Sequence, residues 1–290
     1  MLRAVEAKRP FVDIMRARTP LEATRKFLDE TKVIDDAARA RVGALSADLR
    51  QEITARLVAA KDYEAYRLPS LMADIEKSMS DFRERYMRDA AQLFRDYAAL
   101  GQTSVDAPLA SIGVEIHLPA SSLNVFQVAQ RFSASLVKYV TEDTIARISR
   151  EVTLAATGVQ SPFEAIKKIE RQIDDPLQFG TLQNRAETIL RTEGGRVQSM
   201  AAQNRLEEAR AVVPGLQKQW LWSGVSRKQH AAINGQVRDI DKPYNVPGSR
   251  YCSKDELMFP RDPSGLACQT INCACQSIPY KKEWGLEELT

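Results

Sequence analysis

The sequence predicts an α+β fold, with a predominantly α-helical N-terminal region and a small C-terminal α+β lobe that is rich in loops. Up to about residue 213, apolar residues recur at steps of three and four, which is the spacing of amphipathic helices. From Pro214 onward this spacing is lost, and the segment holds all 4 cysteines, all 3 tryptophans and six of the 13 prolines. We therefore divide the chain into a helical N-terminal region at 1–110, a second helical part at 111–214 and a cysteine-rich lobe with short strands at 215–290.

The N-terminal region carries two helix signals of different strength. Residues 1–42 predict short helices, and Thr19-Pro20 forms a helix start, because proline fits the first helical position. The stronger signal is a stripe that predicts a helix over about 70–100. Its apolar residues are Met72, Ile75, Met79, Phe82, Tyr86, Leu93 and Tyr97. Such a stripe is typical of a core or a helix-pair seam; as the alternative, Phe82, Tyr86 and Tyr97 would bind a partner protein.

The second helical part is expected to begin with one short strand, because residues 112–118 alternate apolar and polar side chains. Helices are then predicted over about 121–157 and 181–212. Between them, Ser161-Pro162-Phe163-Glu164 has the pattern of a capping box at a helix start. Gly194-Gly195 inside the last helix indicates a kink, or the close approach of another backbone.

The C-terminal lobe shows short elements followed by a long stretch without periodicity. Residues 219–222 and 236–240 are predicted strands, and residues 226–233 predict one or two helical turns. Residues 243–278 are rich in proline, glycine, serine, asparagine and cysteine, so they predict irregular structure held by specific contacts.

Charge and hydropathy restrict the function classes. The net charge is +3 at pH 7, without a basic patch, whereas a protein held to DNA by many phosphate contacts usually has a stronger basic excess. Any DNA contact is therefore expected to be non-specific. No apolar run approaches the ~18 residues that a membrane-spanning helix needs. The first residues lack the apolar core of a signal peptide, so we expect folding in the cytoplasm, where thiols stay reduced.

The best constellation for chemistry is a set of four thiols and one imidazole. A tetrahedral zinc site takes such ligands, and a loop-rich lobe would gain stability from a metal. The spacing of the cysteines differs from that of standard zinc ligand pairs, so two alternatives stay open: reduced cysteines in a small core, and a disulfide. The candidate zinc ligands are Cys252, Cys268, Cys273, Cys275 and His230.

An ordered series of short motifs runs through the C-terminal half. In chain order these are Arg185-Ala-Glu-Thr-Ile-Leu-Arg191-Thr192-Glu193, Lys218-Gln-Trp220-Leu-Trp222, Arg227-Lys-Gln-His230-Ala-Ala-Ile-Asn234-Gly235, Pro243-Tyr244, Phe259-Pro260-Arg261-Asp262-Pro263 and Ile271-Asn272-Cys273-Ala274-Cys275. In its order and spacing, the series resembles the head morphogenesis domain of phage minor head proteins, the phage Mu F-like family. The likeness covers roughly 120–280. Asn234 stands where this family usually has aspartate.

The resemblance implies a structural component of the virion that acts near the portal in head assembly, and in some phages in DNA packaging or ejection. Its implied partners are the portal protein and other phage head proteins, met in the host cytoplasm during assembly. The resemblance assigns no catalytic residue, and the sequence contains no Walker A, G-x-S-x-G, H-E-x-x-H or G-x-G-x-x-G motif. We therefore expect a protein that is not an enzyme.

Two other functions are alternatives to virion assembly. Head morphogenesis domains are sometimes fused to toxins of the ADP-ribosyltransferase type, but such toxins follow the Cys-x-Cys segment, and only fifteen residues follow Cys275 here. A zinc-stabilised nucleic-acid-binding module is the second alternative, and the modest net charge argues against it.

Overall fold

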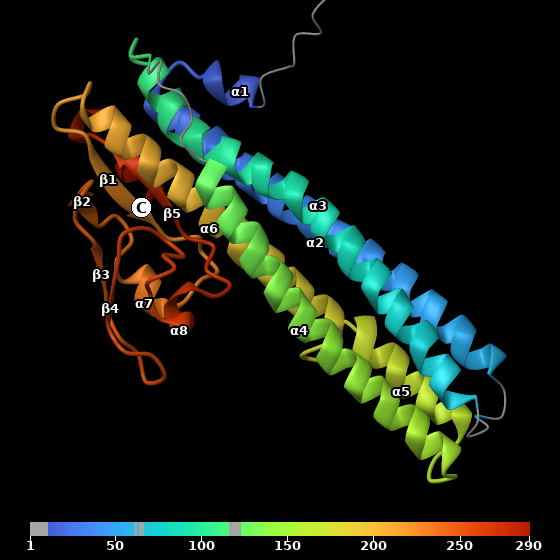
Figure 1. The fold of residues 1–290 in the computed structure, drawn as a ribbon. Coiled ribbons are helices and arrows are strands. Elements are labelled where there is room, and N and C mark those ends of the chain that lie inside the picture. The colour runs from blue at the N-terminus through green and yellow to red at the C-terminus, as the bar shows by residue number, and fades with distance from the viewer. Residues whose placement is uncertain (1–10, 61–62, 64–66, 116–122) are drawn as a thin grey trace, which may run out of the picture. The chain divides into compact units, whose positions relative to one another are not determined.

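The computed structural model describes residues 11–60, 63, 67–115 and 123–290 and has the predicted α+β fold (Figure 1). The helices are α1 (Val12–Met15), α2 (Pro20–Ala59), α3 (Leu68–Ala110), α4 (Leu123–Ala156), α5 (Pro162–Asp174), α6 (Leu182–Arg210), α7 (Lys228–Ala231) and α8 (Ala267–Thr270). The strands are β1 (Gln217–Leu221), β2 (Val237–Asp239), β3 (Tyr244–Val246), β4 (Asp255–Leu257) and β5 (Gln276–Tyr280). Two 3-10 turns, Lys282–Trp284 and Leu286–Leu289, follow β5.

The chain forms two compact units, each built from separate stretches. One unit, called the helical unit, comprises Asp36–Gln92 and Gln130–Arg191. The other, called the mixed unit, comprises Met1–Asp35, Leu93–Ala129 and Thr192–Thr290. The division of the chain at 110/111 and 214/215 stays a prediction. The unit boundaries fall inside α2, α3, α4 and α6.

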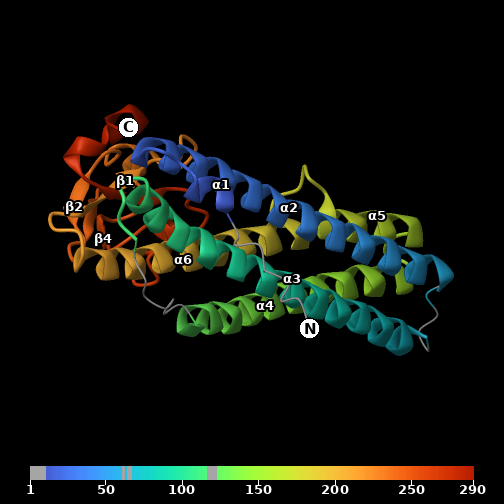
Figure 2. The ribbon, with the colours of Figure 1, turned by 90° about the horizontal axis from the view of Figure 1, so that it is seen from above.

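The helical unit is stabilised by an apolar core and by polar contacts between its helices. In it, α2 and α3 run antiparallel (Figures 1 and 2), with Arg85 paired to Asp48 at 2.6 Å. Helix α5 begins at the predicted capping box, in which Ser161 and Glu164 satisfy each other's backbone N–H groups. It then buries Ala165, Ile169 and Ile173. The helix predicted over 121–157 is confirmed by α4, and the helix start predicted at Ser161 is confirmed by α5.

Two helices are longer than the sequence predicted. Of the short helices expected in 1–42, only α1 is short, because α2 begins at the predicted Thr19-Pro20 start and runs unbroken to Ala59. One continuous buried stripe explains its length: Ala23, Phe27, Ile34, Ala38, Val42, Leu45, Leu49, Ile53 and Leu57. Helix α3 continues ten residues beyond the predicted end, because Val105, Ala107 and Leu109 are buried and Pro108 falls in the last turn. The strand predicted over 112–118 is absent from 111–115, and its remainder lies outside the described residues.

The aromatic residues proposed as partner anchors lie inside the chain. Phe82, Tyr86 and Tyr97 are each at most 3% exposed. The Tyr86 hydroxyl donates to the Ala186 carbonyl at 3.1 Å, and the Tyr97 hydroxyl donates to Asp35 at 2.5 Å. The core interpretation of the stripe therefore holds, and these three side chains are not available to a partner at the surface of the folded chain.

The mixed unit contains both sheets. β1 is the centre of an antiparallel sheet of order β2-β1-β5, with Gln219 opposite Val237 on one side and Ile278 on the other. β3 and β4 form a separate antiparallel pair. The prediction of irregular structure throughout 243–278 is therefore too broad: β3, β4, α8 and part of β5 lie in it. Their runs of three to five residues are too short for periodicity to reveal.

Gly194 and Gly195 allow two side chains to approach α6 closely. A Cβ atom on Gly194 would lie 2.3 Å from a ring carbon of Tyr97, and one on Gly195 would lie 2.4 Å from the guanidinium carbon of Arg261. Helix α6 continues through both glycines. The predicted close approach is real, but it is made by side chains rather than by another backbone.

In the part of the chain that the structure describes, no helix is both long enough and apolar enough to span a bilayer.

Candidate metal centre

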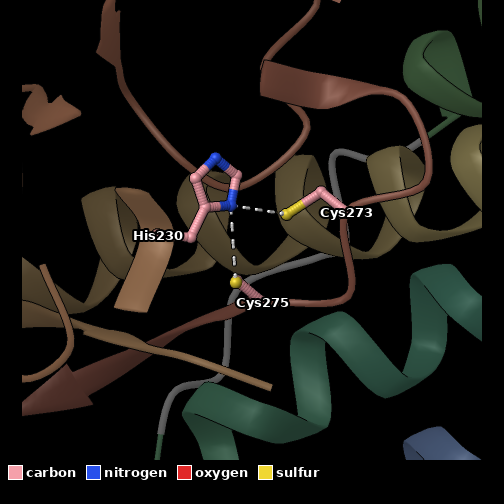
Figure 3. Close-up of side chains that lie close together, drawn as sticks. All are labelled: His230, Cys273 and Cys275. Atoms are coloured by element: carbon pink, nitrogen blue, oxygen red, sulfur yellow. Dashed lines mark hydrogen bonds between the residues drawn. The ribbon is translucent and has the colours of Figure 1, made fainter. Parts of the chain in front are cut away.

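Three of the candidate zinc ligands come together in the mixed unit. The Sγ atoms of Cys273 and Cys275 lie 3.4 Å and 3.6 Å from Nδ1 of His230, and all three residues are buried. Figure 3 shows both sulfur atoms facing the same ring nitrogen. The ligand atoms lie within 4.8 Å of one another, so this group could bind a metal ion.

The local fold places these residues at one end of the three-stranded sheet β2-β1-β5. Cys273 and Cys275 are separated by one residue and immediately precede β5, while His230 lies on the short helix α7. The indole of Trp220 on β1 meets the imidazole edge-on, with ring centroids 5.3 Å apart. Trp220 belongs to the apolar cluster around the site, which also contains Ile233, Tyr244, Val246, Leu257, Cys273 and Cys275, with Trp222 packed against it.

Gln269 contacts the opposite nitrogen of His230. Its Oε1 lies 3.0 Å from His230 Nε2, and its amide Nε2 donates to the backbone carbonyls of Ser253 at 3.0 Å and Pro247 at 3.4 Å. The amide nitrogen is thus directed at carbonyl acceptors, so Oε1 faces the imidazole as an acceptor. This arrangement favours the proton on Nε2 and leaves the Nδ1 lone pair for the two sulfur atoms.

Arg261 holds the backbone of the Cys-x-Cys segment. Its guanidinium donates to the carbonyls of Cys273 at 2.8 Å and Cys275 at 3.3 Å. Arg261 is itself buried and reaches this position across Gly195, which has no side chain to block it. The segment is also tied to α6 by the Asn272 N–H, which donates to the Thr192 hydroxyl at 3.0 Å.

The two thiols are electrostatically unequal. The hydrogen bond from Cys275 and the charge of Arg261 lower the pKa of Cys273 well below its usual value. The same bond and burial raise the pKa of Cys275. The site therefore favours one thiolate beside one thiol, and a thiolate is the form of cysteine that binds metals.

The geometry fits zinc. Typical Zn–S and Zn–N bonds of about 2.3 Å and about 2.0 Å place sulfur and nitrogen ligands about 3.5 Å apart on a tetrahedron. The measured separations from Nδ1 are 3.4 Å and 3.6 Å. Ser226 Oγ lies 3.4 Å from the same nitrogen and 4.0 Å from Cys273 Sγ, next to the group. A fourth position could thus be taken by this hydroxyl or by water.

The other two candidate ligands do not join this group. Cys252 and Cys268 form a disulfide, with Cα atoms 5.9 Å apart. The prediction of one site with five ligands is therefore wrong: two cysteines are bonded to each other, and the other three candidates face one another. The disulfide alternative holds for Cys252 and Cys268, and the expectation that every thiol stays reduced does not.

Sequence reasoning missed the residues that support the ligands. Gln269 and Ser226 carried no motif signal, because each acts through a contact between segments far apart in the chain. Arg261 was identified only as a member of a motif, and no supporting role was predicted for it. The available signal was its position in that motif, directly before an acidic residue and a proline. Its buried contacts with the Cys-x-Cys carbonyls explain why that motif belongs with the cysteines.

Lys218 on β1 is a buried lysine near the site, and its titration makes the free energy of unfolding of the lobe depend on pH. Its ammonium donates to the Met258 carbonyl at 2.7 Å, and burial lowers the pKa of Lys218 from 10.5 to about 8. The unfolded chain therefore holds this proton more tightly than the folded one. We expect the free energy of unfolding to rise between about pH 8 and pH 10.5, by up to ~1.4 kcal/mol per pH unit.

Urea unfolding of the Lys218→Met variant across this pH range checks the assignment. The variant should lack the Lys218 contribution, so its stability relative to the natural protein should fall as the pH rises. Lys242→Met, which removes an exposed lysine from the same lobe, is the matched control. If both variants keep the slope of the natural protein, the titration of Lys218 is not its source.

Comparison with known proteins gives two partial likenesses. The chain is 33% identical over 92 residues to the NAD(+)–arginine ADP-ribosyltransferase EFV of Enterococcus faecalis, a match that covers 31% of this chain and 18% of that protein. It is 25% identical over 261 residues to the uncharacterized protein YqbB of Bacillus subtilis, covering 88% of this chain and 72% of that protein. No protein-family model matches the chain, and no solved structure matches it significantly.

Proposed function

We propose that the chain is a phage minor head protein, a virion component that binds the portal protein and other head proteins in the host cytoplasm during head assembly. The observation that carries this proposal is that the motifs resembling the head morphogenesis domain converge in one buried cluster. Trp220, His230, Tyr244, Cys273 and Cys275 contact one another or share its core.

Several other motif residues support the segments that carry this cluster. Arg261 donates to the Cys-x-Cys carbonyls, Thr192 accepts from Asn272, and Arg227 donates to the Ile271 carbonyl at 2.5 Å. Glu193 is buried and pairs with Arg196 at 2.8 Å. Burial raises the pKa of Glu193 despite this arginine. These residues stabilise the fold of the lobe through contacts within it. Such structural contacts favour an assembly role over a catalytic role.

The transferase likeness does not change this proposal. The match covers 18% of the Enterococcus faecalis protein. Most of that protein, to which the named activity belongs, lies outside the matched residues. The reactive groups of the cluster here are buried, whereas a transferase must bring its substrates to its catalytic groups. We therefore propose that the chain is not an enzyme.

We further propose that the cluster binds one zinc ion with a structural role. Cys273, Cys275 and His230 would be its ligands, and bound zinc would link α7 to the segment before β5. The separations of the ligand atoms support zinc, and so does the buried, apolar surrounding of the thiols. A small lobe made of short strands and loops gains the most from such a link.

Co-expression with the portal protein of the same phage tests the function. The full-length chain, carrying a tag, should capture the portal protein but not the portal protein of an unrelated phage. The Cys273→Ser/Cys275→Ser double variant is expected to lose capture if the lobe carries the contact. The proposal would be overturned if the natural chain captures neither portal, capsid nor scaffold protein. Capture of DNA alone, abolished by salt, would favour the nucleic-acid alternative.

A further inference from the structure

The disulfide and Gln269 join the same two segments beside the metal centre. Cys268 immediately precedes Gln269 on α8, and Cys252 immediately precedes Ser253, whose carbonyl accepts from the Gln269 amide. The two segments are therefore joined by the disulfide and by a hydrogen bond between the two residues that follow its cysteines. The position of the Gln269 side chain is set from both sides.

The fixed position of Gln269 has a consequence for His230. Because the Gln269 amide nitrogen is directed at the carbonyls of Ser253 and Pro247, its Oε1 can only accept from the imidazole, at 3.0 Å. An imidazole binds a metal through the nitrogen without a proton, and the hydrogen bond at the other nitrogen decides which one that is. For His230, the free nitrogen is Nδ1, the one that faces both sulfur atoms.

We propose that Gln269 is the positioning residue of the metal centre and that the Cys252–Cys268 disulfide makes its metal affinity depend on thiol redox state. The metal part of this inference rests on the proposed zinc site; the positioning of His230 does not. None of the three ligands is a partner in the disulfide, so redox state would act on metal binding through the support of His230.

The disulfide can be reached by a small reductant. Cys252 is buried, but Cys268 is exposed, so attack can occur from the Cys268 side. A dithiol would supply two electrons and two protons. It would leave thiols at Cys252 and Cys268 and would itself become a cyclic disulfide. The two segments would then no longer be joined covalently, and the hydrogen bonds of the Gln269 amide would remain, with the one that the Leu266 N–H donates to Asp255 at 2.7 Å.

The first test measures the tautomer of His230 in metal-free protein. The chain contains only 2 histidines, so nitrogen-15 NMR of the ring nitrogens can be assigned simply. We expect the proton of His230 on Nε2 in the natural protein, and a mixture of tautomers in Gln269→Met, which keeps the length of the side chain but lacks its oxygen. Gln236→Met is the matched control, because Gln236 accepts from Asn245 in the same lobe and its hydrogen bond does not involve His230.

The second test measures zinc affinity by competition with a chromophoric chelator. Loss of a supporting hydrogen bond to a ligand typically costs 10–100-fold in metal affinity, and we expect a loss in this range for Gln269→Met. Cys252→Ser/Cys268→Ser, which reproduces the reduced state without any reductant, should lose about tenfold, at the lower end of that range. Gln236→Met should bind zinc as the natural protein does.

The outcomes separate the two proposals. If the Nε2 tautomer is found and lost in Gln269→Met while the natural protein binds no zinc, the positioning role stands and the zinc proposal fails. A proton on Nδ1 in the natural protein, or an unchanged tautomer in Gln269→Met, overturns the positioning role. If Gln269→Met does not fold, the cysteine double variant decides, and unchanged zinc affinity in it overturns the redox dependence.

Discussion

Replacing Trp220 with alanine is expected to destabilise the mixed unit by about 3 to 5 kcal/mol, the usual cost of removing a fully buried large aromatic side chain. Trp220 is 0% exposed and lies on β1, the only strand that pairs on both sides in the described part of the chain. Its indole meets Tyr244 and His230 edge-on, at centroid distances of 5.2 Å and 5.3 Å. The cavity would therefore open against His230 of the proposed metal centre.

Urea unfolding followed by circular dichroism measures this loss. Two controls calibrate it: Trp222→Ala, a half-buried tryptophan next to the same strand, should cost less, and Tyr251→Ala, at 84% exposure, should cost close to nothing. Should Trp220→Ala be as stable as Tyr251→Ala, the cluster around Trp220 is not the core of the lobe.

Removing zinc is expected to lower the stability of the mixed unit by a comparable amount. A ligand that binds only the folded state stabilises it by about 4 kcal/mol when its free concentration is 1,000 times its dissociation constant. The freshly purified protein should carry about one zinc equivalent. Adding a strong chelator should lower the melting temperature, and returning zinc should restore it.

Two double variants show whether the proposed ligands cause this effect. Cys273→Ser/Cys275→Ser should contain no zinc and should not respond to the chelator. Cys252→Ser/Cys268→Ser keeps all three proposed ligands and should still respond. Metal analysis near zero in the natural protein, with a melting temperature that the chelator leaves unchanged, would leave the group as buried thiols beside an imidazole.

Local signals in the sequence predicted the fold class and several elements well. The capping box at Ser161 and the strand predicted over 219–222 depend on neighbouring residues; the capping box is confirmed, and β1 covers 217–221. The length of α2 was underestimated, because the stripe that it buries includes Ala23, Thr31 and Ala38, side chains that give only a weak apolar signal in the sequence. The hairpin β3–β4 was missed because each strand has only three residues.

The candidate site was predictable as a set of residue types but not as a set of contacts. The cysteine count and His230 indicated metal ligands, yet spacing alone could not separate Cys252 and Cys268, which pair with each other, from Cys273 and Cys275. That separation depends on the folding of residues 247–270 around Gln269. Contacts between distant segments decide it, and a single sequence does not display them.

A chain with the proposed assembly function should be part of the phage head. Quantitative mass spectrometry of heads purified by density gradient from the phage that encodes the chain tests it most directly. We expect the chain to cosediment with the heads, at a small and constant ratio to the portal protein across preparations. If the chain is found only in the soluble fractions, while the portal and capsid proteins sediment together, the assembly function is contradicted.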